Sequence, residues 1–174
     1  MNNPFTRYIA DEAHYNEVIT CMGAVKRELW EGTADIKDVY IRQGRGAAPL
    51  LGLWAGLLER GVNVRLIHAK EPGPAFREDF DRFPILASAM ERVLCPRVHF
   101  KLIIMDLVCA YIGSANLTGA GMGMKSDRRR NFEAGILTTD PALVTAAIEQ
   151  FDGVWMGRYC PLCGRKKFCA DGIA

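Results

Sequence analysis

Apolar residues recur at the spacing of a helix in four segments of this sequence. Those segments are residues 13–30, 49–59, 85–93 and 140–155. A proline stands near the start of the second and fourth segments, and a glycine follows the first and second segments at Gly32 and Gly61. Proline just inside the start and glycine just past the end are typical of helices. We therefore expect four helices.

Short apolar runs between these segments predict strands. The runs are residues 38–41, 62–69, 98–105, 108–114 and 131–138, with a turn expected at residues 43–46 and a structured loop over residues 71–84. The order strand, helix, strand over residues 38–69 is typical of a right-handed crossover between parallel strands. The sequence therefore predicts an α/β fold with an at least partly parallel sheet.

The composition fits one compact globular domain. The chain has 174 residues, of which 49% are hydrophobic, and 22 basic residues nearly balance 20 acidic ones to give a net charge of +2. That balance does not by itself indicate a polyanionic partner. The polar N-terminal residues and the charges at Lys101 and Asp106, which interrupt the most apolar region, argue against a secretory signal and a membrane span. We expect a cytoplasmic protein without a membrane partner.

Polar side chains with complementary chemistry gather in residues 98–116. His99 and Lys101 are two apart on a predicted strand, so both side chains should emerge on one face. Ser114 and Asn116 are likewise two apart at the end of the next strand, and Gly113 allows a close backbone approach. An imidazole nucleophile, a cation and neutral hydrogen-bond donors form a set that suits phosphoryl transfer without a metal.

These residues resemble the signature of the phospholipase D superfamily, which is HxK, four residues, D, six residues and GSxN. The sequence matches every fixed position, with His99, Lys101, Asp106, Gly113, Ser114 and Asn116. The resemblance implies a mixed β-sheet flanked by helices on both faces. It also implies hydrolysis of a phosphodiester bond without a catalytic metal.

The resemblance implies a role for each residue of the motif. His99 would be the nucleophile that forms a phosphohistidine, and Lys101 and Asn116 would bind the phosphate. Glu133, which lies downstream in the segment RNFEAGI, would fix the tautomer of the imidazole. Asp106 would hydrogen-bond a turn as a structural residue instead of contacting the substrate.

The motif occurs once, although the reaction of this superfamily needs two histidines. His14 and His68 lack the rest of the motif, and nothing in the sequence specifies a catalytic role for either of them. The resemblance to small bacterial nucleases with one motif implies a homodimer in which His99 of each chain completes a shared site. The fold would then be half of a phospholipase D-like unit.

The glycine-rich segment that follows the motif ends in a cluster of basic residues. This cluster consists of Lys125, Arg128, Arg129 and Arg130. Two interpretations remain open, because such charges are commonly a solvated loop but here lie close enough in sequence to the motif to follow a phosphate backbone.

The C-terminal segment CPLCGRKKFC contains the CxxC spacing of a metal-binding knuckle. Cys160, Cys163 and Cys169 would supply three ligands, and Cys95, which is also followed by proline, is our candidate for the fourth. Zinc and an iron–sulfur cluster both accept four thiolates, so both remain open. Cys21 and Cys109 are expected to be buried thiols.

Taken together, the sequence predicts a catalytic domain over residues 1–157 and a cysteine-rich tail over residues 158–174. The expected function is a homodimeric nuclease that acts on DNA or RNA. Two alternatives remain, namely a phospholipid-cleaving enzyme and a catalytically silent module that binds nucleic acid.

Overall fold

A mixed sheet of seven strands forms the centre of the structure. The computed structural model describes residues 3–37, 39–43 and 46–171. The strands of the main sheet are β1 (Thr6–Ala10), β2 (Glu28–Thr33), β5 (Asn63–His68), β6 (Glu91–Leu94), β7 (Lys101–Met105), β8 (Cys109–Gly113) and β9 (Ala134–Thr138). They lie in the order β1-β9-β8-β7-β2-β5-β6. β2, β5 and β6 are parallel, and every other pair of neighbours in this sheet is antiparallel.

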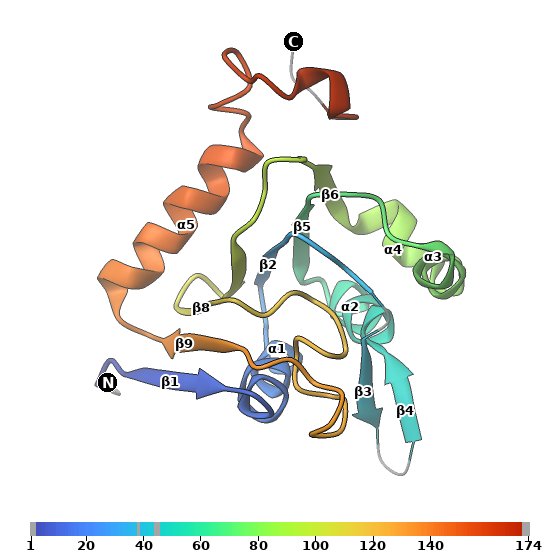
Figure 1. Cartoon of the computed structure of the whole chain (residues 1–174), viewed down its shortest axis with the longest axis vertical. Coiled ribbons are helices and arrows are strands. Elements are labelled where there is room, and N and C mark those ends of the chain that lie inside the picture. The colour runs from blue at the N-terminus through green and yellow to red at the C-terminus, as the bar shows by residue number, and fades with distance from the viewer. Residues whose placement is uncertain (1–2, 38, 44–45, 172–174) are drawn as a thin grey trace.

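Helices cover both faces of this sheet. The helical segments are a π-helix η1 (His14–Ile19), α1 (Thr20–Gly23), α2 (Leu50–Glu59), α3 (Pro74–Asp81), α4 (Pro84–Ala89), α5 (Pro141–Trp155) and a 3-10 turn η2 (Lys166–Phe168). α5 packs on β7 and β8, while α1 and α2 lie on the opposite side (Figure 1). The predicted α/β fold, with helices on both faces of a mixed sheet, is confirmed.

The alternation of side chains along the central strands explains why helices pack on both faces of the sheet. Leu29 and Ile103 belong to a buried cluster that includes residues of α1 and α2. Their neighbours in sequence, Trp30 and Ile104, belong to the cluster that includes residues of α5. Because successive side chains of a strand point to opposite faces, one strand contributes to both cores.

The helix predicted over residues 13–30 is wrong in its second half. Helical structure ends at Gly23, and Glu28–Thr33 form β2. β2 is hydrogen-bonded to β5 on one side and to β7 on the other, and five of its six residues are buried. Only Leu29 and Trp30 of this strand are large apolar residues, while Glu31, Gly32 and Thr33 are buried without being apolar. The sequence of β2 therefore shows neither the alternation nor the apolar run of a strand, and Leu29 simply continues the helical spacing of the preceding residues.

The crossover predicted over residues 38–69 begins at the wrong strand. Among the described strands, β3 (Tyr40–Gln43) pairs only with β4 (Gly46–Pro49), in a separate antiparallel hairpin. The parallel neighbour that precedes β5 in sequence is β2, so the connection between these two strands contains both the hairpin and α2. Residue 38 and residues 44–45 of the predicted turn lie outside the described residues.

Residues 71–94 also differ from the prediction. The expected loop contains α3, which begins at Pro74 and buries Phe76 in the core. The predicted helix at residues 85–93 ends at Ala89, and the following residues form β6. β6 pairs with β5, and local spacing does not reveal pairing with a strand that lies far away in sequence.

The second half of the chain follows the prediction closely. β7, β8 and β9 form where strands are expected, although β7 begins at Lys101 and not at residue 98. The Asp140 carboxylate accepts hydrogen bonds from two backbone N–H groups at the start of α5, as its predicted position requires. In the part of the chain that the structure describes, no helix is long and apolar enough to cross a membrane.

Candidate active site

The HxK and GSxN halves of the motif meet where the start of β7 lies beside the end of β8. β7 and β8 are antiparallel, and their register pairs Lys101 with Gly113. His99 lies two residues before β7, and Ser114 and Asn116 follow the end of β8. The predicted convergence is therefore present, although His99 precedes the strand and does not belong to it.

Lys101 lies directly beside the backbone and the ring of His99. Its Nζ atom donates a hydrogen bond to the His99 carbonyl oxygen at 2.7 Å and lies 3.2 Å from His99 Nδ1. An ammonium group has no acceptor, so Nδ1 carries no proton in this contact. His99 is exposed, whereas Lys101 is buried. Burial lowers the pKa of Lys101, and the charge of Glu133 opposes that effect.

Asn116 is held through its side-chain oxygen. Oδ1 accepts hydrogen bonds from the Thr33 hydroxyl at 3.2 Å and from the Asp35 backbone N–H at 3.1 Å. Thr33 also accepts a hydrogen bond from the N–H of Leu117, so β2 and the GSxN turn fix one another. Because both contacts use Oδ1, the Asn116 amide can present its N–H donors to a ligand.

Thr33 and Asp35 are site residues that sequence reasoning missed. They come at and just after the carboxyl end of β2, a parallel strand at the centre of the sheet. Ligands of α/β sheets bind at that end of parallel strands, so the position was an available signal. The strand was not recognised because its first half, Glu28 to Trp30, was predicted to belong to a helix.

Glu133 contacts Ser114 instead of the imidazole. The Ser114 hydroxyl donates to Glu133 Oε2 at 2.5 Å, and Asn131 Nδ2 donates to Oε1 at 3.0 Å. Ser114 Oγ in turn accepts from the backbone N–H of Ala134 at 3.0 Å. Within the described residues, no hydrogen bond joins Glu133 to His99. Glu133 therefore lies at the site as a partner of Ser114, and the contact expected to fix the His99 tautomer is absent from this arrangement.

Glycines make room for a buried tyrosine beneath the GSxN turn. A Cβ atom on Gly113 would lie 2.2 Å from Tyr111 Oη, and one on Gly135 would lie 2.6 Å from Tyr111 Cε2. Tyr111 Oη accepts a hydrogen bond from the N–H of Ala115 at 3.3 Å, inside the turn. Burial raises the pKa of Tyr111 to about 12. Tyr111 is a third residue that sequence reasoning missed, and it supports the turn through this hydrogen bond.

Asp106 lies at the far end of β7 from His99. Its carboxylate accepts hydrogen bonds from the backbone N–H groups of Lys26, Arg27 and Glu28, at 3.1, 2.7 and 3.1 Å. Burial opposes ionisation, but these three donors together outweigh it and lower the pKa of Asp106. Asp106 thereby anchors the start of β2 and lies apart from the other motif residues.

The four residues of the basic cluster have different environments. Lys125, Arg128 and Arg129 are exposed. Arg130 forms ion pairs with Glu12 at 3.1 Å and with Asp127 at 2.6 Å, which tie the loop to the N-terminal segment. Three of the four residues are therefore accessible to a polyanion, while Arg130 holds the loop in place.

The other two histidines and one glutamate are buried. His14 and Glu31 have no exposed surface, and His68 is 1% exposed. Burial lowers the pKa of His68 and raises that of Glu31 well above its ordinary value. The indole of Trp54 approaches Glu31 and partly offsets this rise, without reaching hydrogen-bond geometry. All three side chains are therefore core residues that a substrate cannot reach.

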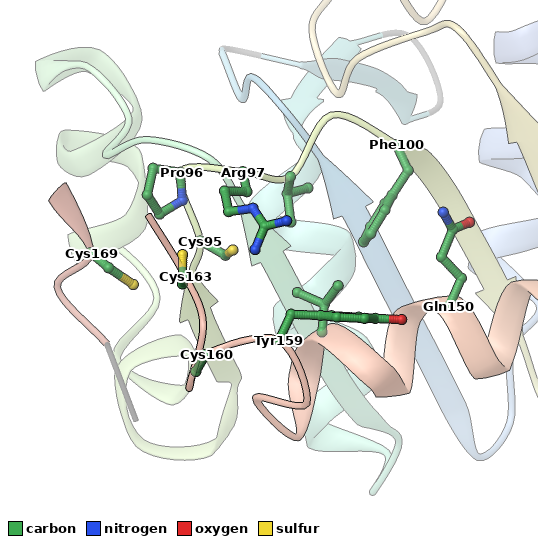
Figure 2. A pocket seen from close by; sticks show the side chains of 11 residues that line it. Cys95, Pro96, Arg97, Phe100, Gln150, Tyr159, Cys160, Cys163 and Cys169 are labelled. Atoms are coloured by element: carbon green, nitrogen blue, oxygen red, sulfur yellow. The ribbon is translucent and has the colours of Figure 1, made fainter. Parts of the chain in front are cut away.

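The four cysteines predicted to bind a metal line one pocket. This pocket lies between the C-terminal tail and the segment that connects β6 to β7 (Figure 2). Among the described residues, no three His, Cys, Asp or Glu side chains converge closely enough to hold an ion as they stand. Cys21, which was expected to be buried, is exposed on the short helix α1.

Solved structures share this fold at low sequence identity. Nuc from Salmonella typhimurium, a phospholipase D family member, matches with a TM-score of 0.65 and 16% identity, over 88% of this chain and 95% of its own. NucT from Helicobacter pylori matches with a TM-score of 0.63 and 13% identity, over 86% and 94%. TrmBL2, an archaeal chromatin protein, matches with a TM-score of 0.60 and 13% identity, over 87% and 52%.

Sequence comparison gives the family. No curated protein sequence matches this chain. A family model described as "Cardiolipin synthase, PLD-like domain" matches residues 46–155, which is more than half of the chain and includes the motif from His99 to Asn116. This chain therefore belongs to the family of phospholipase D-like (PLD-like) domains.

Proposed function

We propose that this protein is a phosphodiesterase that cleaves nucleic acids through a covalent phosphohistidine on His99. The observation that carries the proposal is that the side chains of His99, Lys101 and Asn116 converge where the start of β7 lies beside the end of β8. The exposed imidazole of His99 lies 3.2 Å from Lys101 Nζ, and Asn116 is fixed through its oxygen so that its amide can donate. This set provides a nucleophile and two donors for phosphate oxygens.

The first step forms a bond between nitrogen and phosphorus. His99 attacks through Nε2 while the bond between phosphorus and the leaving oxygen breaks. Lys101 and Asn116 donate hydrogen bonds to the non-bridging oxygens, where negative charge is stabilised. Attack by Nε2 requires the imidazole proton to be on Nδ1, so the incoming phosphate must first draw Lys101 away from that atom.

A second histidine must protonate the leaving oxygen and then activate water. His14 and His68 are buried in the core, so in the described chain His99 is the one histidine accessible to substrate. We infer that the partner subunit's His99 supplies this group in a homodimer. It would donate a proton to the leaving oxygen and later accept one from the water that hydrolyses the phosphohistidine.

Nucleic acid is the proposed substrate because of the exposed charge near the site. Lys125, Arg128 and Arg129 follow the GSxN turn and are exposed, so they are available to contact a phosphate backbone. Phe132, between this cluster and Glu133, is 94% exposed and offers a surface on which an unpaired base could stack. Structural similarity to Nuc and NucT over nearly their whole length agrees with this choice.

The test is cleavage of labelled single- and double-stranded DNA and RNA by the wild-type protein and by His99→Ala. We expect cleavage that persists in a chelator and that is lost in the variant. Circular dichroism in the same buffer controls for unfolding by the chelator. Cleavage that requires added magnesium would contradict the mechanism. Phosphatidylcholine and cardiolipin vesicles incubated with the same preparation test for hydrolysis of lipids.

A catalytically silent DNA-binding module is the second candidate. The similarity to TrmBL2, whose structure is described as showing a novel mode of DNA binding, favours it. Filter binding separates the two proposals. Binding that is unchanged in His99→Ala, without cleavage by the wild-type protein, would favour the silent module.

A further inference from the structure

Four cysteines from two distant parts of the chain gather around one cavity of about 260 Å³. Cys95 follows β6, and Cys160, Cys163 and Cys169 belong to the tail beyond α5. The sulfur atoms of Cys95, Cys163 and Cys169 point into the space between these segments (Figure 2). All six cysteines of the chain are free thiols, so no disulfide joins the tail to the domain.

The tail is already docked beside Cys95. The thiol of Cys169 donates to the Leu94 carbonyl oxygen at 3.5 Å, and the Leu94 N–H donates to the Asp171 carboxylate at 2.6 Å. Both contacts fall on the residue that immediately precedes Cys95. Cys169 is therefore held at the same strand end as Cys95.

A backbone donor and basic side chains lie beside the knuckle. The Arg165 N–H donates to Cys163 Sγ at 3.4 Å, two residues along the chain. Arg97 lines the same cavity, and Lys166 follows Cys163 three residues along the chain. Four thiolates around one divalent cation carry a net charge of −2, which these basic residues would offset.

Apolar burial contributes little to holding the tail. Leu162 is 97% exposed and Phe168 is 57% exposed, so the largest apolar side chains of this segment face solvent. Short cysteine-rich segments of this kind commonly obtain their folding free energy from a bound metal. A metal ion held by the four thiols would supply such free energy to this segment.

We propose that Cys95, Cys160, Cys163 and Cys169 bind one Zn²⁺ ion in a structural site. Zinc–sulfur bonds of about 2.3 Å require sulfur atoms closer together than they stand here, so binding would draw the exposed knuckle onto Cys95. Cys95 lies four residues before His99, and Phe100, which packs against Gly32, also lines the cavity. The ion would therefore fix the segment that carries His99, and this last consequence rests on the proposed function.

Metal content of the purified full-length protein tests the site directly. We expect about one zinc per chain by mass spectrometry of the metal, with loss of most of it in Cys160→Ser and Cys163→Ser. Cys21→Ser is the matched control, because Cys21 is exposed and lies on α1 outside the cavity, and it should retain zinc. Protein without zinc, zinc that persists in both knuckle variants, or a brown protein that contains iron would overturn the proposal.

Two further measurements cover the case in which the variants fail to fold. Cobalt added to the metal-free wild-type protein should give the visible absorption bands of a tetrahedral thiolate site, and absence of these bands would contradict the site. Hydrogen exchange should become faster in peptides that cover residues 95–100 when zinc is removed. His99→Ala should lose cleavage and keep its zinc. Wild-type protein that contains zinc but cleaves no nucleic acid would contradict the proposed function alone, and wild-type protein that cleaves but contains no zinc would contradict this site alone.

Discussion

Substitution of Asp106 tests whether this motif residue is structural or catalytic. Its carboxylate accepts three backbone N–H groups at the start of β2, at the opposite end of β7 from His99. Asp106 also adopts a positive φ of 52°, which aspartate and asparagine tolerate better than alanine. We therefore expect Asp106→Ala to lower the free energy of unfolding while leaving the chemistry of the folded protein intact.

The expected loss in free energy of unfolding follows from these hydrogen bonds and from the backbone conformation. Hydrogen bonds to a charged acceptor contribute about 1.5–3 kcal/mol each. Lys26 and Arg27 are exposed, so water can replace the acceptor at their N–H groups, whereas Glu28 is half-buried and loses more. With about 1 kcal/mol for alanine at this φ, we expect a loss of about 2–4 kcal/mol. Asp106→Asn keeps an oxygen acceptor and tolerates the backbone, so about half of that loss is expected.

Urea unfolding at pH 7 measures this loss, with Asp81→Ala on the exposed end of α3 as the control. The folded-state pKa of Asp106 lies below its ordinary value of 3.8, so its contribution is present above about pH 4 and is lost as the pH falls through the folded-state pKa. The difference between the wild-type protein and Asp106→Asn should therefore shrink in acid. An Asp106→Ala protein of wild-type stability that cannot cleave substrate would refute the reasoning.

Three other sets of substitutions give separate tests. The raised pKa of Glu31 makes the stability of the wild-type protein fall as the pH rises above 4.5. Glu31→Gln should therefore be more stable than the wild-type protein by a larger margin at pH 8 than at pH 5, as measured by denaturant midpoints. The same difference in stability at both pH values would contradict this. Gly113→Ala should lower the melting temperature by several degrees and reduce cleavage, because its Cβ would lie 2.2 Å from Tyr111 Oη, and Tyr111→Phe in the same protein should restore part of the loss. Alanine at the three exposed cations, Lys125, Arg128 and Arg129, should raise KM for nucleic acid with little change in kcat. The slope of log binding constant against log salt concentration should fall by about one per lost phosphate contact. An unchanged slope would show that these residues do not contact phosphate.

The sequence predicts the parts of the site that depend on local pairing. β7 and β8 form a hairpin with a tight turn at Asp106 and Leu107, which both have positive φ angles. Because the two strands are adjacent in sequence, the alternation of side chains along each strand and the spacing of the motif were sufficient to predict that His99 and Asn116 come together. The helix after Asp140 was predictable for the same reason, because its cap and its proline are adjacent in sequence.

The contacts that hold the site rigid could not be predicted in this way. Thr33 meets Asn116 across 83 positions of sequence, and Asp106 meets Glu28 across 78. Both contacts depend on β2, a central strand whose buried residues include Glu31, Gly32 and Thr33, so its sequence does not mark it as a strand. The sequence likewise placed Glu133 near the motif, but only the fold specifies that Ser114 is its hydrogen-bond partner.

Trapping of the covalent intermediate tests the central claim most directly. The wild-type protein would be mixed with an oligonucleotide that carries a labelled phosphate, quenched in alkali to preserve phosphohistidine, and digested for mass spectrometry. We predict a phosphoryl-linked nucleotide on the peptide that contains His99, at no more than one label per dimer, and none in His99→Ala. A label on another residue, or cleavage without any covalent adduct under the same quench, would contradict the account.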